Sequence, residues 1–348
     1  MPKVMIGMSG GVDSSVAAFL LKEQGYDCVG VTMKLYAGEN TDSTCCGLDD
    51  VEDAKSVCRR LGIPHYTFNF QEAFAREVIE PFAAEYEAGR TPNPCIACNR
   101  FLKFGALWQR ARELGCDYVA TGHYARVCRE GERYFLRTAA DRAKDQSYVL
   151  YFLSQAQLGH TLFPLGGLTK PQVREIAVQQ GFLNAKKHDS QDICFVPDGD
   201  YGAFLASWRG RDYAPGDFID REGNVLGRHR GAPCYTLGQR KGLGVPAATR
   251  LYVTGKDMAR NTVTLGSNEE LFSRELTAGD LRFTGEVPAA GALVQAKVRY
   301  SQQPQPCRVY PEGETLRVTF LEPQRAITPG QAVVLYEGDT VLGGGTIE

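Results

Sequence analysis

The feature that most constrains the fold is an alternation of short apolar runs and helix-like segments between residues 3 and about 121. The apolar runs have the length of strands and read VMIGM, DCVGVTM, HYTFNF and DYVAT, and helical segments are expected at residues 12–24, 48–61 and about 101–114. This order predicts βαβ units, hence an α/β domain with a doubly wound parallel sheet covered by helices on both faces. Ligands of such sheets bind at the carboxyl ends of the strands, so we expect a functional site there.

The composition of the sequence changes after Asp198, where glycines and prolines become closely spaced. From about Leu276 the stretches LVQAKVRY, CRVYPEGETLRVTF and AVVLYEGDTVLGGGTI alternate in polarity around the turns EGE and EGD, as hairpins do. A chain of 348 residues also exceeds what one hydrophobic core usually organises. We therefore expect a catalytic α/β domain at residues 1–200, a small central domain at 201–272 and a C-terminal β barrel at 273–348.

The composition is that of an ordinary globular protein, with 43% hydrophobic and 23% charged residues. The N-terminal apolar run is too short for a signal sequence or a membrane span, so we expect a cytoplasmic protein with no membrane partner. Eleven cysteines in a long chain do not suggest a disulfide framework and favour a catalytic or metal-binding role for a few of them. A net charge of −2 does not indicate a surface that is basic overall, as many nucleic-acid-binding proteins have. Local basic patches are present at Arg100 with Lys103, residues 186–188, residues 228–230, and Arg240 with Lys241.

The first strand runs directly into SGGVDSS, residues 9–15, and then into the apolar face of a helix. Gly10 and Gly11 let the backbone turn tightly and present N–H groups to an anion, while serine hydroxyls and the positive helix end add donors. The lysine of a Walker A loop is missing, so this is another kind of phosphate loop or, alternatively, a tight turn. Two other stretches are placed to complete a nucleotide site, namely Met33 after the second strand and Thr121-Gly122-His123 after DYVA.

Cysteines at two places carry the candidate chemistry. The stretch NPCIACN holds Cys95 and Cys98 before an amphipathic helix, a position that lowers a thiol pKa and favours the thiolate. A structural zinc site is disfavoured because a second C-x-x-C pair is missing, and a thioredoxin-like motif because Pro94 precedes the pair. Cys194 lies in the apolar context DICFV, which on composition alone is equally consistent with a buried structural cysteine. The adjacent Cys45 and Cys46 have no physical explanation in the sequence.

The phosphate loop has the pattern S-G-G-x-D-S and resembles the PP-loop of ATP pyrophosphatases, which cleave between the α and β phosphates and pass adenylate to an acceptor. Together with strings along the whole chain, it resembles the tRNA-specific 2-thiouridylase family, whose members replace the 2-oxygen of the wobble uridine with sulfur. The strings are GMSGGVDSSVAA, GRTPNPCIACN, FLKFGAL, DYVATGHYAR, KDQSYVLYFL, LFPLGGLTKPQVREIA, AKKHDSQDICF, YTLGQRKGLG, KVRYSQQP and PGQAVVLYEGD.

The resemblance implies roles for the residues that match the family's motifs. Cys98 matches the nucleophile, and Cys194 matches the cysteine that carries sulfur as a persulfide. The residues that match ATP contacts are Gly7, Met8, Ser9, Gly10, Gly11, Val12, Asp13, Ser14, Met33 and Gly122. The residues that match contacts to the target base are Asn93, Pro94 and Cys95, and those that match other tRNA contacts are His123, Lys144, Asp145, Gln146, Arg299, Tyr300 and Gln331. The implied partners are tRNA and a sulfur donor, either a cysteine desulfurase or a sulfur-relay protein.

The implied reaction uses ATP and Mg²⁺. The 2-oxygen of uridine is a poor leaving group, so ATP adenylates it, and sulfur then attacks C2 and expels AMP. Asp13 is placed to bind the Mg²⁺ that offsets the charge of the phosphates. Base flipping followed by stacking would hold the uridine, and Tyr124, Tyr148 and Tyr300 are available rings, each equally plausible as part of the core.

Cys95 departs from the family pattern, because the best-known members have aspartate at the matching position. With Cys98 and Cys194 it would supply three thiolates, the set that holds a 4Fe–4S cluster with one iron open for exogenous sulfide. The sequence leaves the persulfide route and the cluster route open. Two other functions also stay open, namely another PP-loop adenylating synthetase, which would leave Cys98 and Cys194 without a role, and a non-catalytic metal-containing RNA-binding protein.

Overall fold

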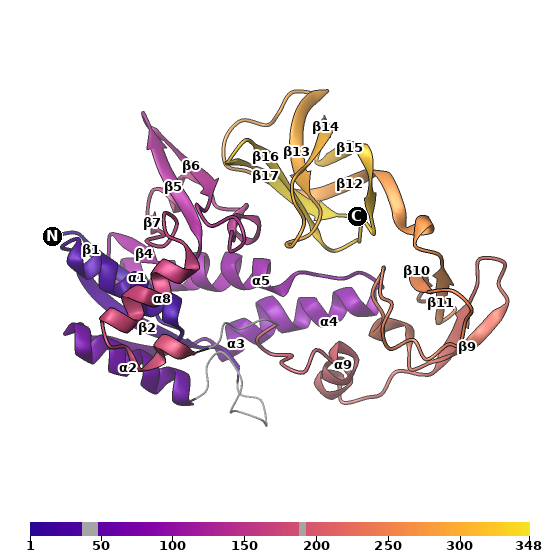
Figure 1. The fold of residues 1–348 in the computed structure, drawn as a ribbon, viewed down its shortest axis with the longest axis horizontal. Coiled ribbons are helices and arrows are strands. Elements are labelled where there is room, and N and C mark those ends of the chain that lie inside the picture. Colours follow the sequence, from indigo (N-terminus) through magenta and orange to yellow (C-terminus); the bar gives the residue numbers. More distant parts are fainter. Residues whose placement is uncertain (37–47, 188–192) are drawn as a thin grey trace.

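The structure, a computed structural model, describes residues 1–36, 48–187 and 193–348. The described residues form a five-stranded sheet near the N-terminus, a four-stranded sheet in the centre of the sequence and a barrel at the C-terminus. Figure 1 shows the N-terminal sheet at one end of the molecule, the central sheet at the other, and the barrel above the helices that lie between them. Within these residues, no helix combines the length and the apolar character needed to cross a membrane.

The N-terminal sheet is parallel throughout and has the strand order β3-β2-β1-β4-β7. Its strands are β1 (Lys3–Gly7), β2 (Asp27–Lys34), β3 (His65–Asn69), β4 (Tyr118–Ala120) and β7 (Thr161–Leu162). The chain winds outward from β1 to β3 and then crosses to β4 on the other side of β1. This reversal places the switch point beside the carboxyl end of β1, where α/β sheets bind ligands. The predicted doubly wound sheet is confirmed.

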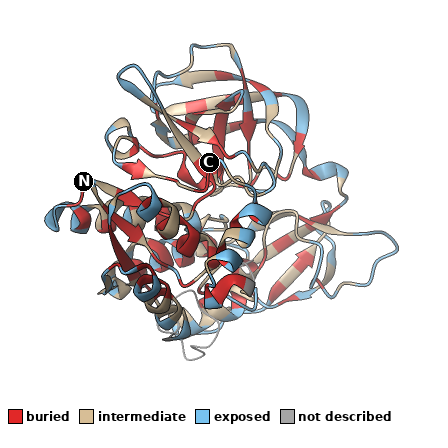
Figure 2. Cartoon of the chain, turned by 60° about the vertical axis from the view of Figure 1, so that its left-hand side comes forward, coloured by how far each residue is buried: buried red, intermediate tan, exposed pale blue. Residues whose placement is uncertain are grey.

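Helices cover both faces of this sheet. Alternate side chains of β1 point to opposite faces, so that Val4 and Ile6 belong to one buried cluster and Met5 to another. The first cluster is covered by α1 (Val12–Glu23), α2 (Leu48–Leu61) and α8 (Lys170–Gln179), and the second by α6 (Leu107–Glu113). Figure 2 shows the buried residues concentrated inside this domain and inside the barrel, with exposed residues on the outer helix faces.

Two helical runs connect β3 to β4. The first comprises α3 (Gln71–Phe74), the π segment η2 (Ala75–Ile79) and α4 (Glu80–Glu87), and the second comprises α5 (Pro94–Ala97), the π segment η3 (Cys98–Ala106) and α6. The expected helix start at about residue 101 is wrong, because Asn93 caps the second run and Pro94 fits its first helical position. The first run was not expected; Pro81 interrupts its sequence pattern but is tolerated in the first turn of α4.

The C-terminal barrel has six strands and is closed by the pairing of β12 with β17, which confirms the predicted barrel. Its strands are β12 (Phe272–Phe283), β13 (Ala292–Lys297), β14 (Gln305–Glu312), β15 (Thr315–Arg325), β16 (Ala332–Glu337) and β17 (Thr340–Ile347). A hairpin that the sequence analysis did not identify, β5 (Ala125–Glu130) with β6 (Arg133–Thr138), leaves the N-terminal domain and pairs with β17 through Arg137 and Thr340. The barrel and the N-terminal domain therefore share backbone pairing.

The central region is a small mixed sheet with the strand order β10-β11-β8-β9. Its strands are β8 (Gly216–Ile219), β9 (Val225–His229), β10 (Tyr252–Asp257) and β11 (Thr262–Gly266). Before this sheet, α9 (Tyr201–Arg209) lies against α4, where Arg209 forms ion pairs with Glu80 and Glu87. The remaining short helices are η4 (Ser147–Leu150), α7 (Gln155–Leu158), η5 (Leu183–Lys186), η6 (Ala232–Cys234) and η7 (Glu269–Leu271).

Candidate active site

The phosphate loop lies between the end of β1 and the start of α1, at the switch point of the sheet. Gly10 has a φ of 72°, and a Cβ on it would lie 2.4 Å from the carbonyl oxygen of Asp50, so the position requires glycine. The Ser9 N–H donates to the Ser14 hydroxyl at 3.2 Å, and that hydroxyl donates to the Gly11 carbonyl at 3.1 Å. The loop is therefore held in one conformation by its own side chains.

Two segments that are distant from the phosphate loop in the sequence pack against it. A Cβ on Gly122 would come within 2.8 Å of the Asp13 carbonyl carbon and the Ser14 nitrogen, so the chain after β4 passes directly against the start of α1. From η5, the Asn184 side-chain amide donates to the Gly10 carbonyl at 2.9 Å and to the Ser15 hydroxyl at 3.0 Å. Gly122 is thus beside the loop, as the sequence predicted for a nucleotide site, and Asn184 is a support that the sequence analysis missed.

Asp13 is engaged by two residues that the sequence did not connect with it. The Lys170 ammonium donates to both Asp13 carboxylate oxygens at 2.8 and 2.9 Å, and the Tyr124 hydroxyl donates to Oδ1 at 2.8 Å. Lys170 is the first residue of α8 and only 7% exposed, so it brings one buried positive charge to the first turn of α1. Within the described residues, no group of three or more His, Cys, Asp or Glu side chains could hold a metal ion.

The C-x-x-C stretch starts the second helical run. Asn93 caps it, with its side-chain oxygen accepting the Cys95 N–H at 3.1 Å. Cys95 is exposed, whereas Cys98 is half-buried at the start of the π segment η3. A π segment within an α-helical run is frequent at functional sites. The two cysteines of the motif therefore lie in different environments.

Cys98, Cys194 and Met33, which are far apart in the sequence, border the same buried part of the protein. All three pack against one buried cluster that includes Phe74, Phe82 and Phe195. This cluster lies at the end of β2, next to the edge of the sheet that carries the phosphate loop. Cys95 is not among the residues packed there. Cys98 and Cys194 thus border the same apolar cluster, whereas Cys95 is exposed.

The three thiols do not fit an iron–sulfur cluster in this structure. Cys95, Cys98 and Cys194 all belong to the described residues, where no group of three or more His, Cys, Asp or Glu side chains is placed to hold a metal ion. The physical reason is that Cys95 faces the surface while the other two pack on the apolar cluster. Cys45 and Cys46, the pair without an explanation, lie outside the described residues.

In the predicted tRNA-binding turn at residues 144–146, the side chains of Asp145 and Gln146 form hydrogen bonds within the protein. Asp145 accepts hydrogen bonds from the Ala139 N–H at 2.9 Å and the Ser147 hydroxyl at 2.8 Å. The Gln146 side chain accepts the Tyr124 N–H at 2.9 Å. Since Tyr124 also donates to Asp13, a chain of hydrogen bonds joins this turn to the phosphate loop.

Arg299 and Tyr300 lie together just after β13. The Arg299 guanidinium donates to the carbonyls of Arg325 and, at 3.0 Å, Ala326. Tyr300 is 42% exposed and meets the buried ring of Tyr148 edge to face, with the centroids 6.2 Å apart. Burial, followed by the charges of Asp145 and Cys95, raises the pKa of Tyr300 to about 12. The predicted RNA-binding and base-binding residues Tyr300, Asp145 and Cys95 are therefore near enough for their charges to interact.

Two predicted tRNA contacts bond to other parts of the protein, and they are the buried His123 and the half-buried Gln331. His123 is 7% exposed, bonds to the Thr121 hydroxyl at 2.7 Å and packs against the rings of Phe104 and Phe163, which also contact each other. Burial, with a smaller effect from Lys103, holds the pKa of His123 well below its ordinary value, so the ring is neutral. Gln331 donates to the Thr91 carbonyl at 2.7 Å and so joins the barrel to the turn that precedes Asn93. His123 is therefore buried, whereas Gln331 keeps part of its surface exposed.

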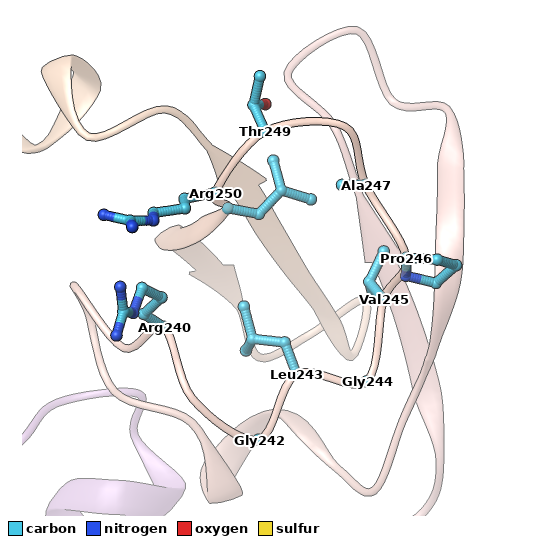
Figure 3. Close-up of a pocket in the computed structure, with 10 residues that line it drawn as sticks. Arg240, Gly242, Leu243, Gly244, Val245, Pro246, Ala247, Thr249 and Arg250 are labelled. Atoms are coloured by element: carbon cyan, nitrogen blue, oxygen red, sulfur yellow. The ribbon is translucent and has the colours of Figure 1, made fainter.

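Most of the predicted basic patches are neutralised by acidic neighbours. Arg100 pairs with Asp280, Arg228 with Asp217, Arg230 with Asp200, and Lys187 with Asp50 and Asp53. His188 lies outside the described residues. Arg240 differs, because it lines an open depression of about 410 Å³ together with Arg250. In Figure 3 both guanidinium groups extend to the same side of the loop at residues 242–249, so this depression carries two basic side chains.

Three side chains near the site were missed by the sequence analysis. They are Lys170, Asn184 and Lys297. Lys170 could have been found from its place in LTKPQ, since a capping box after a strand marks a helix that starts at the carboxyl edge of the sheet. No local signal distinguishes Asn184 or Lys297, because their importance comes from segments far away in the chain.

Known proteins match the chain along almost its whole length. The sequence profile of the tRNA methyl transferase HUP domain matches residues 2–198, that of the tRNA methyl transferase PRC-barrel domain residues 203–267, and that of the aminomethyltransferase beta-barrel domain residues 273–347. The tRNA-specific 2-thiouridylase MnmA of Clostridioides difficile is 50% identical over 356 residues, which cover 99% of this chain and 98% of the relative. Relatives of the same name from Desulforamulus reducens and Carboxydothermus hydrogenoformans are each 52% identical, over 99% of this chain and 97% of theirs.

Proposed function

We infer the function of this chain from the family to which it belongs, that of the tRNA-specific 2-thiouridylases, and we propose ATP-dependent 2-thiolation of the wobble uridine (U34) of tRNA. The observation that carries the proposal is the packing of Cys98 and Cys194 on one cluster beside the edge of the sheet where the phosphate loop lies. A phosphate loop alone would fit any adenylating enzyme. The two thiols beside it provide a place for sulfur.

In the first step, ATP binds at the phosphate loop and the 2-oxygen of the uridine attacks its α phosphorus. The bond between the α and β phosphates breaks, and pyrophosphate leaves. Backbone N–H groups of residues 9–14 and the N-terminus of α1 stabilise the charge on the phosphates. Mg²⁺, held chiefly by the phosphates, would offset further charge. Lys170 contributes by neutralising Asp13, which would otherwise repel the nucleotide.

In the second step, the terminal sulfur of a Cys194 persulfide attacks C2, and AMP leaves with the former 2-oxygen. The Cys98 thiolate then attacks the Cys194 sulfur, which breaks the S–S bond of the persulfide and leaves 2-thiouridine and a Cys98–Cys194 disulfide. A thiol reductant returns both cysteines to thiols with two electrons. The packing of both cysteines on the same cluster supports this route, and the exposed Cys95 has no part in it.

The proposed partners follow from this chemistry. A donor of persulfide sulfur, such as a cysteine desulfurase or a sulfur-relay protein, must reload Cys194 after each turnover. tRNA is the acceptor, and Asn93, Pro94 and the ring of Tyr300 are the proposed contacts around its uridine. The reaction would take place in the cytoplasm, where the proposed tRNA substrate is found.

The test is a thiolation assay with tRNA, ATP, Mg²⁺ and a persulfide donor, followed by chromatography of the digested nucleosides. We expect 2-thiouridine from the wild type, with AMP and pyrophosphate released only when tRNA is present. Cys98→Ala and Cys194→Ala should reduce the product at least a hundredfold, whereas the control Cys128→Ala, in the outer hairpin strand β5, should remain active. Release of AMP without tRNA, or full activity of Cys98→Ala, would favour a different adenylating enzyme.

A further inference from the structure

Lys297 is a largely buried lysine whose ammonium has no paired carboxylate among the described residues, and its Nζ keeps a little solvent contact, because it is not one of the fully buried polar atoms without a partner. It ends β13, and its side chain is only 7% exposed. Among the residues that the structure describes, its Nζ forms no ion pair and no hydrogen bond. Its neighbours are the ring centroids of Tyr148 and Tyr300, at 5.7 and 5.9 Å. Asp145 is near enough to act on its charge but is already bonded to Ala139 and Ser147.

Burial without a partner is unfavourable for an ammonium. Contact with an aromatic face returns only about 0.5–2 kcal/mol, less than the several kcal/mol that removal of a charge from water costs. Two other lysines with little exposed surface have polar partners for their ammonium groups: Lys170 pairs with Asp13, and Lys256 donates to the Tyr235 carbonyl at 2.8 Å. Lys297 is the exception, and a side chain held at such a cost points to an anionic ligand that arrives from outside.

The surroundings of Lys297 indicate which anion fits. Tyr300 presents an exposed ring directly beside it, and Cys95 and Asp145 are close enough to influence Tyr300. An exposed ring next to a cation is the arrangement with which proteins bind single-stranded nucleic acid, since a base stacks on the ring and the cation meets the backbone. ATP is the less suitable ligand, because its proposed loop already has Lys170 and lies on another domain.

We propose that the Lys297 ammonium binds a backbone phosphate of the single-stranded RNA loop that carries the target uridine, while a base of this loop stacks on Tyr300. The inference rests on the proposed function for the identity of the RNA. The inference adds a phosphate-binding residue on the barrel. It also gives a reason for the position of the Lys297 ammonium next to the Tyr300 ring, where it has no paired carboxylate. The phosphate replaces the water that the ammonium lost on folding.

The first experiment compares tRNA binding by the wild type, Lys297→Met and Lys256→Met over a range of salt concentrations, without ATP. Methionine fills a similar volume without charge, and Lys256→Met is the matched control because it removes another largely buried lysine from the separate central sheet. Lys297→Met should weaken binding by about tenfold and lower the slope of log K against log salt by about 0.7–0.9, the share of one phosphate contact. Lys256→Met should keep the wild-type slope.

A stability measurement separates binding from a structural role. Removing an unpaired buried charge should leave the melting temperature of Lys297→Met unchanged or raise it, whereas a structural lysine would lower it on replacement. If Lys297→Met unfolds, Lys297→Gln takes its place in the phosphate-substitution experiment described next. The comparison of Lys297→Gln with the wild type then tests whether Lys297 binds a phosphate.

The second experiment replaces one phosphate of an anticodon stem–loop RNA at a time with a neutral methylphosphonate. For the wild type, one position near the target uridine should weaken binding by about tenfold, and the same substitution should have no effect on Lys297→Met or Lys297→Gln. The inference is overturned if every position affects wild type and variant equally, or if the variants bind RNA as the wild type does.

These outcomes are distinguishable from a failure of the proposed function. Thiolation of tRNA by the wild type tests that function and needs no variant. If the wild type thiolates tRNA while its binding does not depend on Lys297, only the phosphate inference fails. If the wild type neither thiolates nor binds tRNA, the proposed function fails, and the inference fails with it.

Discussion

At the scale of single residues, the ion pair between Lys170 and Asp13 makes one prediction. Replacing Lys170 with methionine leaves the Asp13 carboxylate, which is about one-third exposed, beside the phosphate loop without its counter-charge. We expect a loss of about 1–3 kcal/mol in the free energy of unfolding, below the value for a fully buried pair. ATP binding should weaken at least tenfold, because two negative groups then face each other. Urea unfolding and calorimetric titration with ATP measure the two effects.

The double variant Asp13→Asn with Lys170→Met is the control for this prediction. It removes both charges and should regain part of the lost stability. A double variant that is as unstable as the sum of the two single variants would show that the pair contributes nothing by its charge.

His123 makes a second prediction at this scale, on pH dependence. Its pKa in the folded protein is held well below its ordinary value by burial, whereas the unfolded chain titrates near about 6.5. Below that pH the unfolded state binds more protons, so stability must fall as the pH falls, by at most about 1.4 kcal/mol per pH unit for this group. His123→Asn keeps a hydrogen-bonding group near Thr121 and should lose less stability between pH 7 and pH 5 than the wild type. Equal losses by the two proteins would refute the assignment.

At the scale of elements, the approach of the chain after β4 to the start of α1 gives the third prediction. Gly122→Ala places a Cβ 2.8 Å from the backbone of Asp13 and Ser14 and must displace the phosphate loop. We expect ATP binding to weaken by more than tenfold while the far-ultraviolet circular dichroism stays unchanged. The control Gly167→Ala, which meets open space, should bind ATP as the wild type does. Normal ATP binding by Gly122→Ala would show that the loop tolerates the shift.

The same scale shows how far the sequence determines the fold. The parallel sheet was predictable because its buried strands are short apolar runs separated by helices of ordinary period. The hairpin β5–β6 was not, since charged residues interrupt the apolar pattern of both strands and its partner β17 lies about 200 positions further along. The phosphate loop was recognisable from local spacing, whereas the Asp13–Lys170 pair and the lone ammonium of Lys297 depend on long-range packing. Spacing also could not tell that Cys95 faces outward while Cys98 packs inward.

At the scale of the whole molecule, the barrel is positioned against the turn that leads into the C-x-x-C stretch. The Thr91 N–H donates to the Pro329 carbonyl at 2.8 Å, and Gln331 donates to the Thr91 carbonyl. Gly330 lies between them with a φ of 89°, and a Cβ on it would be 3.0 Å from the Thr91 nitrogen. The barrel, which carries Tyr300, and the N-terminal domain, which carries Cys98, therefore meet through backbone contacts that leave little room for a side chain.

The last prediction follows from this contact. Gly330→Ala should push the barrel away from Thr91 and so separate the proposed RNA-binding surface from the cysteines. Gly313→Ala is its matched control, because Gly313 has a φ of 65° and thus the same backbone penalty of about 1–2 kcal/mol, but it meets open space in the β14–β15 turn. Both variants should lose similar stability and bind ATP normally, whereas only Gly330→Ala should lower kcat/KM for tRNA thiolation, by about tenfold or more. Equal thiolation by the two variants would mean that the barrel and the catalytic domain need no fixed relation for the reaction.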